Sequence, residues 1–300
     1  MPQPPDDEVL RLRAEVERLT TEVRRLEASV GQLSGKLEHE LAIARGIQIS
    51  LMPRVFPQPA GWRIASVYRA AREVGGDFFD AYELPSRPGK VGFIVADVTG
   101  KGVTAALVMA FTRAVLRSAA YNGTGPADAL VRTNRVLVKD ASTGLFVTAF
   151  AGEFDTVTGQ LQYASAGHEP PLLVRAADGV VRELDLPDAM MLGAFPDFAA
   201  VETTVQLEPG DLLVAFTDGV TDAINHDRVR FGDARFQAAL GAVAAGGPDH
   251  AVEGVLAAID AFSNGEAAAD DITLLAIGRL ADGRLAGGDL AAPAALSGTA

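Results

Sequence analysis

Four short acidic motifs, far apart along the chain, each lie beside an apolar stretch that is typical of a buried strand. They are Gly75-Gly76-Asp77, the Asp97 near the end of the apolar run in Val91–Gly102, Thr217-Asp218-Gly219, and Asp270-Asp271. Carboxylates at strand ends that face one cleft repel each other unless a cation lies between them, and burying one without a partner is costly. Divalent cations such as Mg²⁺ and Mn²⁺ prefer oxygen ligands. The motifs therefore predict one divalent-metal site, provided that the fold brings them together.

Each motif alone also has a simpler interpretation, because strand-end aspartates often start loops or cap helices, and Asp-Gly is a common turn. The four together, with no compensating basic neighbour in the sequence, favour the metal site. The adjacent glycines let backbone carbonyls reach a metal and leave room for a phosphate. Two such ions lower the pKa of a shared water and aim it at a phosphorus atom. The chemistry expected here is hydrolysis of a phosphate ester.

Composition excludes several other classes of protein. The chain has 300 residues and a net charge of −13, which argues against a nucleic-acid or anionic-membrane binder. It has no cysteine, so disulfides, thiolate catalysis and cysteine-based zinc sites are excluded. The acidic, proline-rich start lacks the basic and apolar regions of a signal peptide. No apolar run approaches the ~18 residues of a membrane span, and we expect a cytoplasmic protein.

A regular apolar repeat runs through the N-terminal segment, with alternating steps of three and four residues. The heptad a positions are Val9, Val16, Val23, Val30 and Leu37, and the d positions are Leu12, Leu19, Leu26 and Leu33. A β-branched a position with leucine at d favours a parallel two-stranded coiled coil. One amphipathic helix packed on its own domain would show a wider apolar face. We therefore predict that residues 1–40 dimerise the chain.

The segment after the repeat is predicted to be a linker helix over Leu41–Met52, within a connection that covers residues 41–60. Met52-Pro53 ends this helix, because proline removes a backbone donor and restricts the residue before it. Since the linker leaves the coil and meets the globular part, it is a candidate element for transmitting a signal.

Residues 61–279 alternate between strand and helix patterns, and we expect the tail at 280–300 to be disordered. Runs of strands interrupted by helix pairs favour an α+β fold, an αββα sandwich of two antiparallel sheets with helices outside. The expected strands are 62–71, 78–84, 90–98, 146–155, 160–166, 171–175, 180–184, 201–207, 211–216 and 272–278. The expected helices are 104–121, 126–139, 234–243 and 249–262.

Five motifs together give the chain a specific family resemblance. They are Glu73–Asp80 (EVGGDFFD), Ala96–Gly102 (ADVTGKG), Ser165–Pro171 (SAGHEPP), Phe216–Asp222 (FTDGVTD) and Asp270–Leu274 (DDITL). In these motifs and their order, over roughly residues 40–279, the chain resembles the PPM-type, metal-dependent serine/threonine protein phosphatases of the SpoIIE/RsbU class.

The resemblance implies a role for each matching residue around two Mn²⁺ or Mg²⁺ ions. Asp97 would bridge the two metals, and the backbone carbonyl of Val98 would join one of them. Asp218 and Asp270 would complete the first metal, and Asp77 would serve the second, directly or through water. Catalysis would then depend on Asp97 and Asp218 and on a water that attacks phosphoserine or phosphothreonine in line, without a phosphoenzyme. Asp271 is expected to cap or orient the loop rather than bind metal.

Other residues near these motifs are weaker candidates. Arg72 is a candidate for contacting the phosphate, although a solvated arginine is favoured. His168 is a candidate general acid, although a structural role is favoured. Gly76 and Gly100 belong to loops that can border the substrate. Gly75–Phe79 departs from the GGDEF signature of diguanylate cyclases at Phe78. Lys101 stands in no P-loop, because Val95 replaces the first glycine, and it is expected to be a loop residue near the site.

The function expected from these observations is dephosphorylation of a regulatory protein in bacterial signalling. The resemblance implies a phosphorylated anti-anti-sigma (STAS) protein as substrate, with no nucleic acid or membrane as partner. An upstream activator acting on the coil or the linker helix is a further hypothesis. The alternative is a non-catalytic coiled-coil adaptor with a degenerate phosphatase fold, against which the intact Asp77, Asp97, Asp218 and Asp270 argue.

Overall fold

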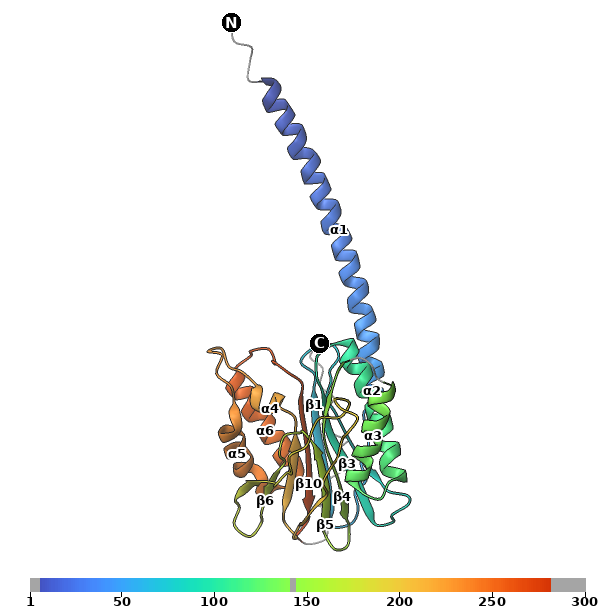
Figure 1. Ribbon diagram of the computed structural model, residues 1–300. Coiled ribbons are helices and arrows are strands. Elements are labelled where there is room, and N and C mark those ends of the chain that lie inside the picture. Colours follow the sequence, from blue (N-terminus) through green and yellow to red (C-terminus); the bar gives the residue numbers. More distant parts are fainter. Residues whose placement is uncertain (1–5, 141–143, 282–300) are drawn as a thin grey trace. The chain divides into compact units, whose positions relative to one another are not determined.

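The computed structural model describes residues 6–140 and 144–281, so almost all of the predicted tail at 280–300 lies outside the described residues. The chain divides into two compact units, Met1–Gly46 and Ile47–Ala300. Figure 1 shows the helices and strands along the chain.

The N-terminal segment is helical throughout its described length. Helix α1 is continuous over Asp6–Leu51 and includes both the predicted repeat and the predicted linker. It ends before Met52-Pro53, which confirms the predicted stop. The side chains at the heptad a and d positions are exposed, with Val16 at 61% and Leu26 at 60%. The chain therefore presents an apolar stripe of coiled-coil spacing, while dimerisation through it stays a prediction.

Ten strands form two five-stranded sheets in which every pairing is antiparallel. The first sheet has the order β1 (Trp62–Arg69), β10 (Ile272–Arg279), β9 (Leu212–Phe216), β6 (Leu172–Val174) and β7 (Val181–Glu183). The second has the order β2 (Phe78–Glu83), β3 (Lys90–Val98), β4 (Val147–Asp155), β5 (Gln160–Ala166) and β8 (Thr203–Gln206). All the predicted strands are present, and the predicted α+β sandwich is confirmed.

Helices cover the outer face of each sheet (Figure 1). The second sheet carries α2 (Val103–Asn122) and α3 (Pro126–Asp140). The first sheet carries α5 (Gly232–Val243) and α6 (Pro248–Ser263). The short α4 (Gly219–Asp222) lies between β9 and α5, and the 3-10 turn η1 (Ala244–Gly246) lies between α5 and α6. The sequence analysis missed α4 and η1, because segments this short carry no periodic signal.

The central strands are buried on both faces, which explains their near-continuous apolar sequences. In β10, Leu275 and Ile277 belong to the core cluster shared with the second sheet, whereas Leu274 and Ala276 belong to the cluster shared with α5 and α6. Aromatic rings cross the gap between the sheets, where Trp62 and Phe154 stack with ring centroids 4.2 Å apart. Strands buried in this way hold the loops at their ends in fixed positions.

One helix of the described residues, α2, is long and apolar enough by length and composition to cross a membrane, which the sequence analysis did not expect. Its packing identifies it as a partly buried core helix that contacts β3 and α3. Two of its arginines pair with the fully buried Asp80 of β2: Arg113 lies 2.8 Å and Arg117 3.2 Å from Asp80 Oδ2. Burial raises the pKa of Asp80, and the two guanidinium groups oppose that rise.

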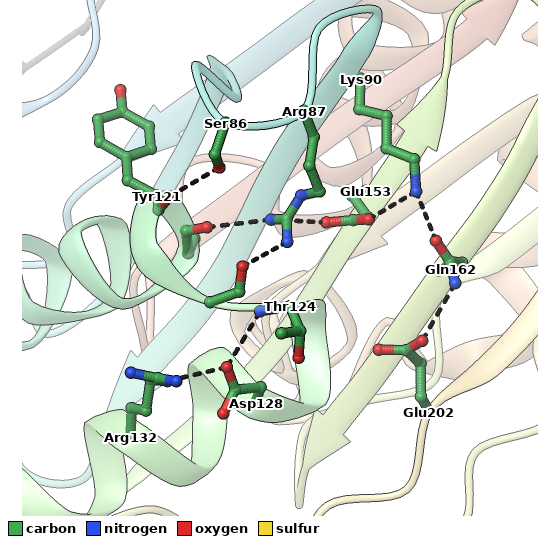
Figure 2. A network of polar contacts seen from close by, with 12 residues as sticks. Ser86, Arg87, Lys90, Tyr121, Thr124, Asp128, Arg132, Glu153, Gln162 and Glu202 are labelled. Atoms are coloured by element: carbon green, nitrogen blue, oxygen red, sulfur yellow. Dashed lines mark hydrogen bonds and ion pairs between the residues drawn. The ribbon is translucent and has the colours of Figure 1, made fainter.

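A polar network ties the α2–α3 connection to the second sheet (Figure 2). Arg87 donates to the carbonyl oxygens of Ala120 and Gly123 and lies 3.0 Å from Glu153 Oε2. Lys90 Nζ lies 2.9 Å from the other oxygen of Glu153. The Glu153 side chain is only 4% exposed, so two cations neutralise a buried carboxylate in the middle of the sheet.

Candidate metal centre

Asp77 joins the two sheets at the end where the acidic motifs meet. It directly precedes β2 of the second sheet and is buried. Its Oδ2 accepts hydrogen bonds from Thr217 Oγ1 at 2.6 Å and from Thr273 Oγ1 at 2.7 Å, both in or beside strands of the first sheet. Burial raises the pKa of Asp77 well above its ordinary value, and the charges of Asp97 and Asp271 raise it further. The two threonines lie within the quoted motifs, but the sequence analysis gave them no role.

Asp97 lies near the end of β3, opposite Thr148 of β4. Burial raises the pKa of Asp97 to about 6. A hydrogen bond with Asp77 opposes the rise, and the charges of Asp218, Asp270 and Asp271 add to it. The structure thus brings the aspartates of all four motifs within electrostatic reach of one another. Mutual repulsion of this kind is relieved by a bound cation.

Gly76 leaves space in front of two oxygen atoms of the site. A Cβ atom at this position would stand 2.7 Å from the backbone carbonyl oxygen of Val98 and 3.4 Å from Asp97 Oδ1. A side chain here would therefore fill the space that faces the Val98 carbonyl and the Asp97 carboxylate. The requirement for glycine is explained by close approach rather than by backbone conformation.

Asp218 and Asp270 belong to the first sheet's end of the site. Asp218 follows β9 and begins α4, and burial, followed by the charge of Asp270, raises its pKa. Asp270 precedes β10, where its Oδ1 accepts a hydrogen bond from the Asp271 amide at 2.9 Å. Lys101 Nζ lies 2.7 Å from Asp270 Oδ2. The expectation that the motifs have no compensating basic neighbour is wrong, because Lys101 of the Ala96–Gly102 motif pairs with Asp270.

Asp271 is buried and holds the loop that precedes Asp77. Its Oδ1 accepts from the Ala71 amide and its Oδ2 from the Gly76 amide, both at 2.8 Å. These contacts fit the orienting role favoured from the sequence, which stays a prediction, and burial raises the pKa of the Asp271 carboxyl group. Asp270 as the metal ligand of this pair stays a prediction.

Gln48, near the end of α1, holds the same loop from the other side. Its side chain is buried and hydrogen-bonds both backbone groups of Gly75. This residue was not predicted from the sequence. Its only signal was a polar side chain among the apolar residues that surround it in the predicted linker helix.

The weaker candidates fall into different positions. His168 is buried, its Nδ1 lies 2.9 Å from Thr148 Oγ1, and its amide donates to Ser165 Oγ. Burial lowers the pKa of His168 to about 4, so at neutral pH its imidazole is uncharged and its contacts suit a structural role. Gly100 has a φ of 92° in the loop after β3. Arg72 is exposed and has no hydrogen bond or ion pair with any described residue.

The donor set fits a divalent-metal centre in its chemistry. As the side chains stand in residues 6–140 and 144–281, no three acidic or histidine side chains converge closely enough to hold an ion. Two threonine hydroxyls engage Asp77, and Lys101 engages Asp270. The raised pKa values and the space in front of the Val98 carbonyl favour a cation here.

Comparison with known proteins gives consistent matches. The family model described as "Stage II sporulation protein E (SpoIIE)" matches residues 87–280. The chain is similar to phosphoserine phosphatase RsbU of Bacillus subtilis, with 30% identity over 187 residues that cover 62% of this chain and 55% of RsbU. It spans about half the length of the curated relatives it matches.

Two solved structures are similar as well. The RsbU and RsbW domains of a Mycobacterium tuberculosis protein align with a TM-score of 0.64 and 30% identity, over 77% of this chain and 63% of that one. The SiaA-PP2C domain of Pseudomonas aeruginosa aligns with a TM-score of 0.70 and 24% identity, over 81% of this chain and 97% of that domain. The second likeness supports the fold alone.

Proposed function

The chain belongs to the SpoIIE family, and from this premise we propose that it is a metal-dependent phosphatase acting on phosphoserine or phosphothreonine of a regulatory protein. The observation that carries the proposal is the mutual electrostatic influence of Asp77, Asp97, Asp218 and Asp270, which lie up to 193 residues apart in sequence (270 − 77). Four carboxylates placed together where two sheets meet do not stabilise a fold, so their clustering favours a functional site.

Each residue of the centre has a part in the proposed reaction. Asp97 would hold both metals, and the Val98 carbonyl would hold one of them. Asp218 and Asp270 would complete the first metal, and Asp77 would serve the second. Two Mn²⁺ or Mg²⁺ ions supply activation of water and stabilisation of charge on the phosphoryl oxygens. Thr217 and Thr273 keep Asp77 in place, and Asp271 and Gln48 fix the loop that carries it.

The proposed substrate is a phosphorylated STAS-type protein of a bacterial partner-switching pathway, acting in the cytoplasm. Support comes from similarity to RsbU, whose name gives phosphoserine phosphatase activity, and from the structure in which RsbU and RsbW domains occur in one protein. The acidic chain, at a net charge of −13, favours a protein partner over nucleic acid or an anionic membrane.

The exposed heptad stripe of α1 supports a homodimer joined by a parallel coiled coil. An upstream activator would act on this coil or on the linker, and the contact of Gln48 with Gly75 offers the path to the metal centre. Deletion of residues 1–40 tests both parts. Unchanged oligomeric state and unchanged activity would remove the coil from the mechanism.

The activity itself is tested by Mn²⁺-dependent hydrolysis of p-nitrophenyl phosphate and of a phosphoserine peptide. Wild-type protein is expected to turn over only with metal, Asp97→Ala and Asp218→Ala to fall to background, and the exposed control Asp197→Ala to match wild type. Absence of metal-dependent turnover on both substrates would favour the alternative, a non-catalytic coiled-coil adaptor with this fold.

A further inference from the structure

Lys101 is placed where a cation of the acidic centre would be expected. It lies in the loop between β3 and α2, and its Nζ contacts Asp270 Oδ2 at 2.7 Å and the Ala269 carbonyl oxygen at 2.6 Å. Its charge also lowers the pKa of Asp218. The ammonium group therefore pairs with one of the two carboxylates that are proposed for the first metal and partly offsets the charge of the other.

Within residues 6–140 and 144–281, no other lysine or arginine forms an ion pair with any of the five clustered aspartates. Arg72, the other basic candidate, makes no such contact. The Lys101 side chain is 37% exposed, so it is accessible to a substrate. Among the lysines and arginines of the described residues, it is thus the one that pairs with this cluster, and it stays partly exposed.

The charges of the centre favour an additional cation for binding of a phosphate ligand. Four carboxylates balance two divalent cations, and Asp271 adds one further negative charge nearby. A phosphoryl dianion that approaches such a centre meets no excess positive charge from those groups. An ammonium group at its edge supplies that charge and a hydrogen-bond donor.

We propose that Lys101 binds the phosphoryl group of the substrate, and that Asp270 holds its ammonium group until metal occupies the centre. A divalent cation beside Asp270 repels the ammonium group and competes for the same carboxylate. Gly100 and Gly102, with φ of 92° and 80°, flank Lys101 and set the tight loop from which its flexible side chain turns toward either partner. This inference rests on the proposed phosphatase function and adds a substrate-binding residue to it.

The test measures binding rather than turnover, on the full chain, with Lys101→Met, Lys101→Arg and the exposed control Lys139→Met. Calorimetry of Mn²⁺ binding without substrate is expected to show about two- to fivefold tighter binding by Lys101→Met, because a partly exposed competing ion pair is lost. Inorganic phosphate binding to the Mg²⁺-loaded protein is expected to weaken by about tenfold in Lys101→Met and to recover in Lys101→Arg. Lys139→Met should match wild type in both.

Unchanged phosphate affinity in Lys101→Met would overturn the proposal, as would equal losses in Lys101→Met and Lys101→Arg. Unchanged or weaker Mn²⁺ binding by Lys101→Met would overturn the competition with metal. Lys101→Gln serves in the same way if the methionine variant does not fold. Since neither measurement needs hydrolysis, failure of wild-type turnover would count against the phosphatase function and leave this test intact.

Discussion

The side-chain amide of Gln48 makes two hydrogen bonds with the backbone of Gly75, donating to its carbonyl oxygen at 2.7 Å and accepting from its amide at 3.1 Å. Gly75 begins the Gly75-Gly76-Asp77 motif, so the end of α1 is fastened to the residue two positions before a proposed metal ligand. Both partners are buried, which makes the pair costly to break.

Replacing Gln48 by alanine is expected to lower the free energy of unfolding by about 2 kcal/mol, because two buried hydrogen bonds are lost. Metal affinity should fall as well, since the loop before Asp77 loses one of its two anchors. Chemical denaturation and Mn²⁺ calorimetry measure the two effects. Ser50→Ala, an exposed change in the same helical turn, is the control. Full metal affinity in Gln48→Ala would show that this contact does not support the centre.

The pH dependence of metal-free stability follows from the raised pKa of Asp97. Its carboxyl group has a pKa of about 6 when folded and a lower ordinary value when unfolded, so the folded state retains the proton more strongly. Stability from this group is therefore present at low pH and is lost as pH rises toward and through about 6. Asp97→Asn removes this loss. With a chelator present to keep the protein free of metal, the free energy of unfolding of the variant should exceed that of wild type by up to about 3 kcal/mol at pH 7.

The advantage of Asp97→Asn should shrink when the same unfolding experiment is done near pH 5. His168 has a lowered pKa and shifts stability in the opposite direction, but it does so equally in both proteins, so the difference isolates Asp97. Added Mn²⁺ should stabilise wild type and not the variant. An equal difference at both pH values would contradict the raised pKa.

Replacement of His168 by asparagine is expected to leave the shape of the pH–rate profile unchanged. Its pKa of about 4 means that its ring is neutral at neutral pH and lacks the imidazolium proton of a general acid, and the ring contacts Thr148 rather than the solvent. Rates should change by a similar factor from pH 6 to pH 9. If the variant selectively lost the part of the pH–rate profile that requires a protonated group, His168 would act as the general acid and this prediction would be wrong.

Glu153→Ala is expected to destabilise the fold by about 3 kcal/mol, because it leaves the cations of Arg87 and Lys90 without their buried partner. Glu202→Ala is the matched control, since this exposed carboxylate meets the same network only through Gln162 (Figure 2). Thermal unfolding compares the two. Equal shifts would mean that burial of Glu153 does not decide the cost.

Leu26→Glu is expected to weaken the proposed dimer by about 100-fold or more, because it places a charge at a d position in both chains. Leu10→Glu is the control, since Leu10 is equally exposed at 59% but occupies a b position outside the a/d stripe. Light scattering over a dilution series measures the association. A monomeric wild-type protein would contradict the coiled coil.

The sequence was most informative where local pattern and burial agree. The bounds of β3 and β5 were predicted to the residue, because turn residues delimit their apolar runs. The aspartates of the centre were identified from their places beside strands. The predicted helices of the globular part all formed, with ends displaced by at most two residues.

Contacts between the sheets could not be predicted in this way. Thr217 and Thr273 reach Asp77 only because β9 and β10 pack across from β2, and sequence spacing does not report that register. The pair of Lys101 with Asp270 joins residues of different loops for the same reason. Gln48 has the pattern of an ordinary polar residue of a linker helix, because its partner is a backbone group that no sequence pattern reports.

The order of strands in the first sheet has a consequence for protein synthesis. β1 has β10 as its only neighbour in that sheet, with Trp62 opposite Arg279 and Arg69 opposite Ile272. The first strand of the domain therefore waits, unpaired, until its last strand has left the ribosome. Asp270 and Thr273 arrive with that same strand, so a chain still being translated lacks a complete acidic centre. The enzyme we propose would become active only after the first and last strands close the sheet.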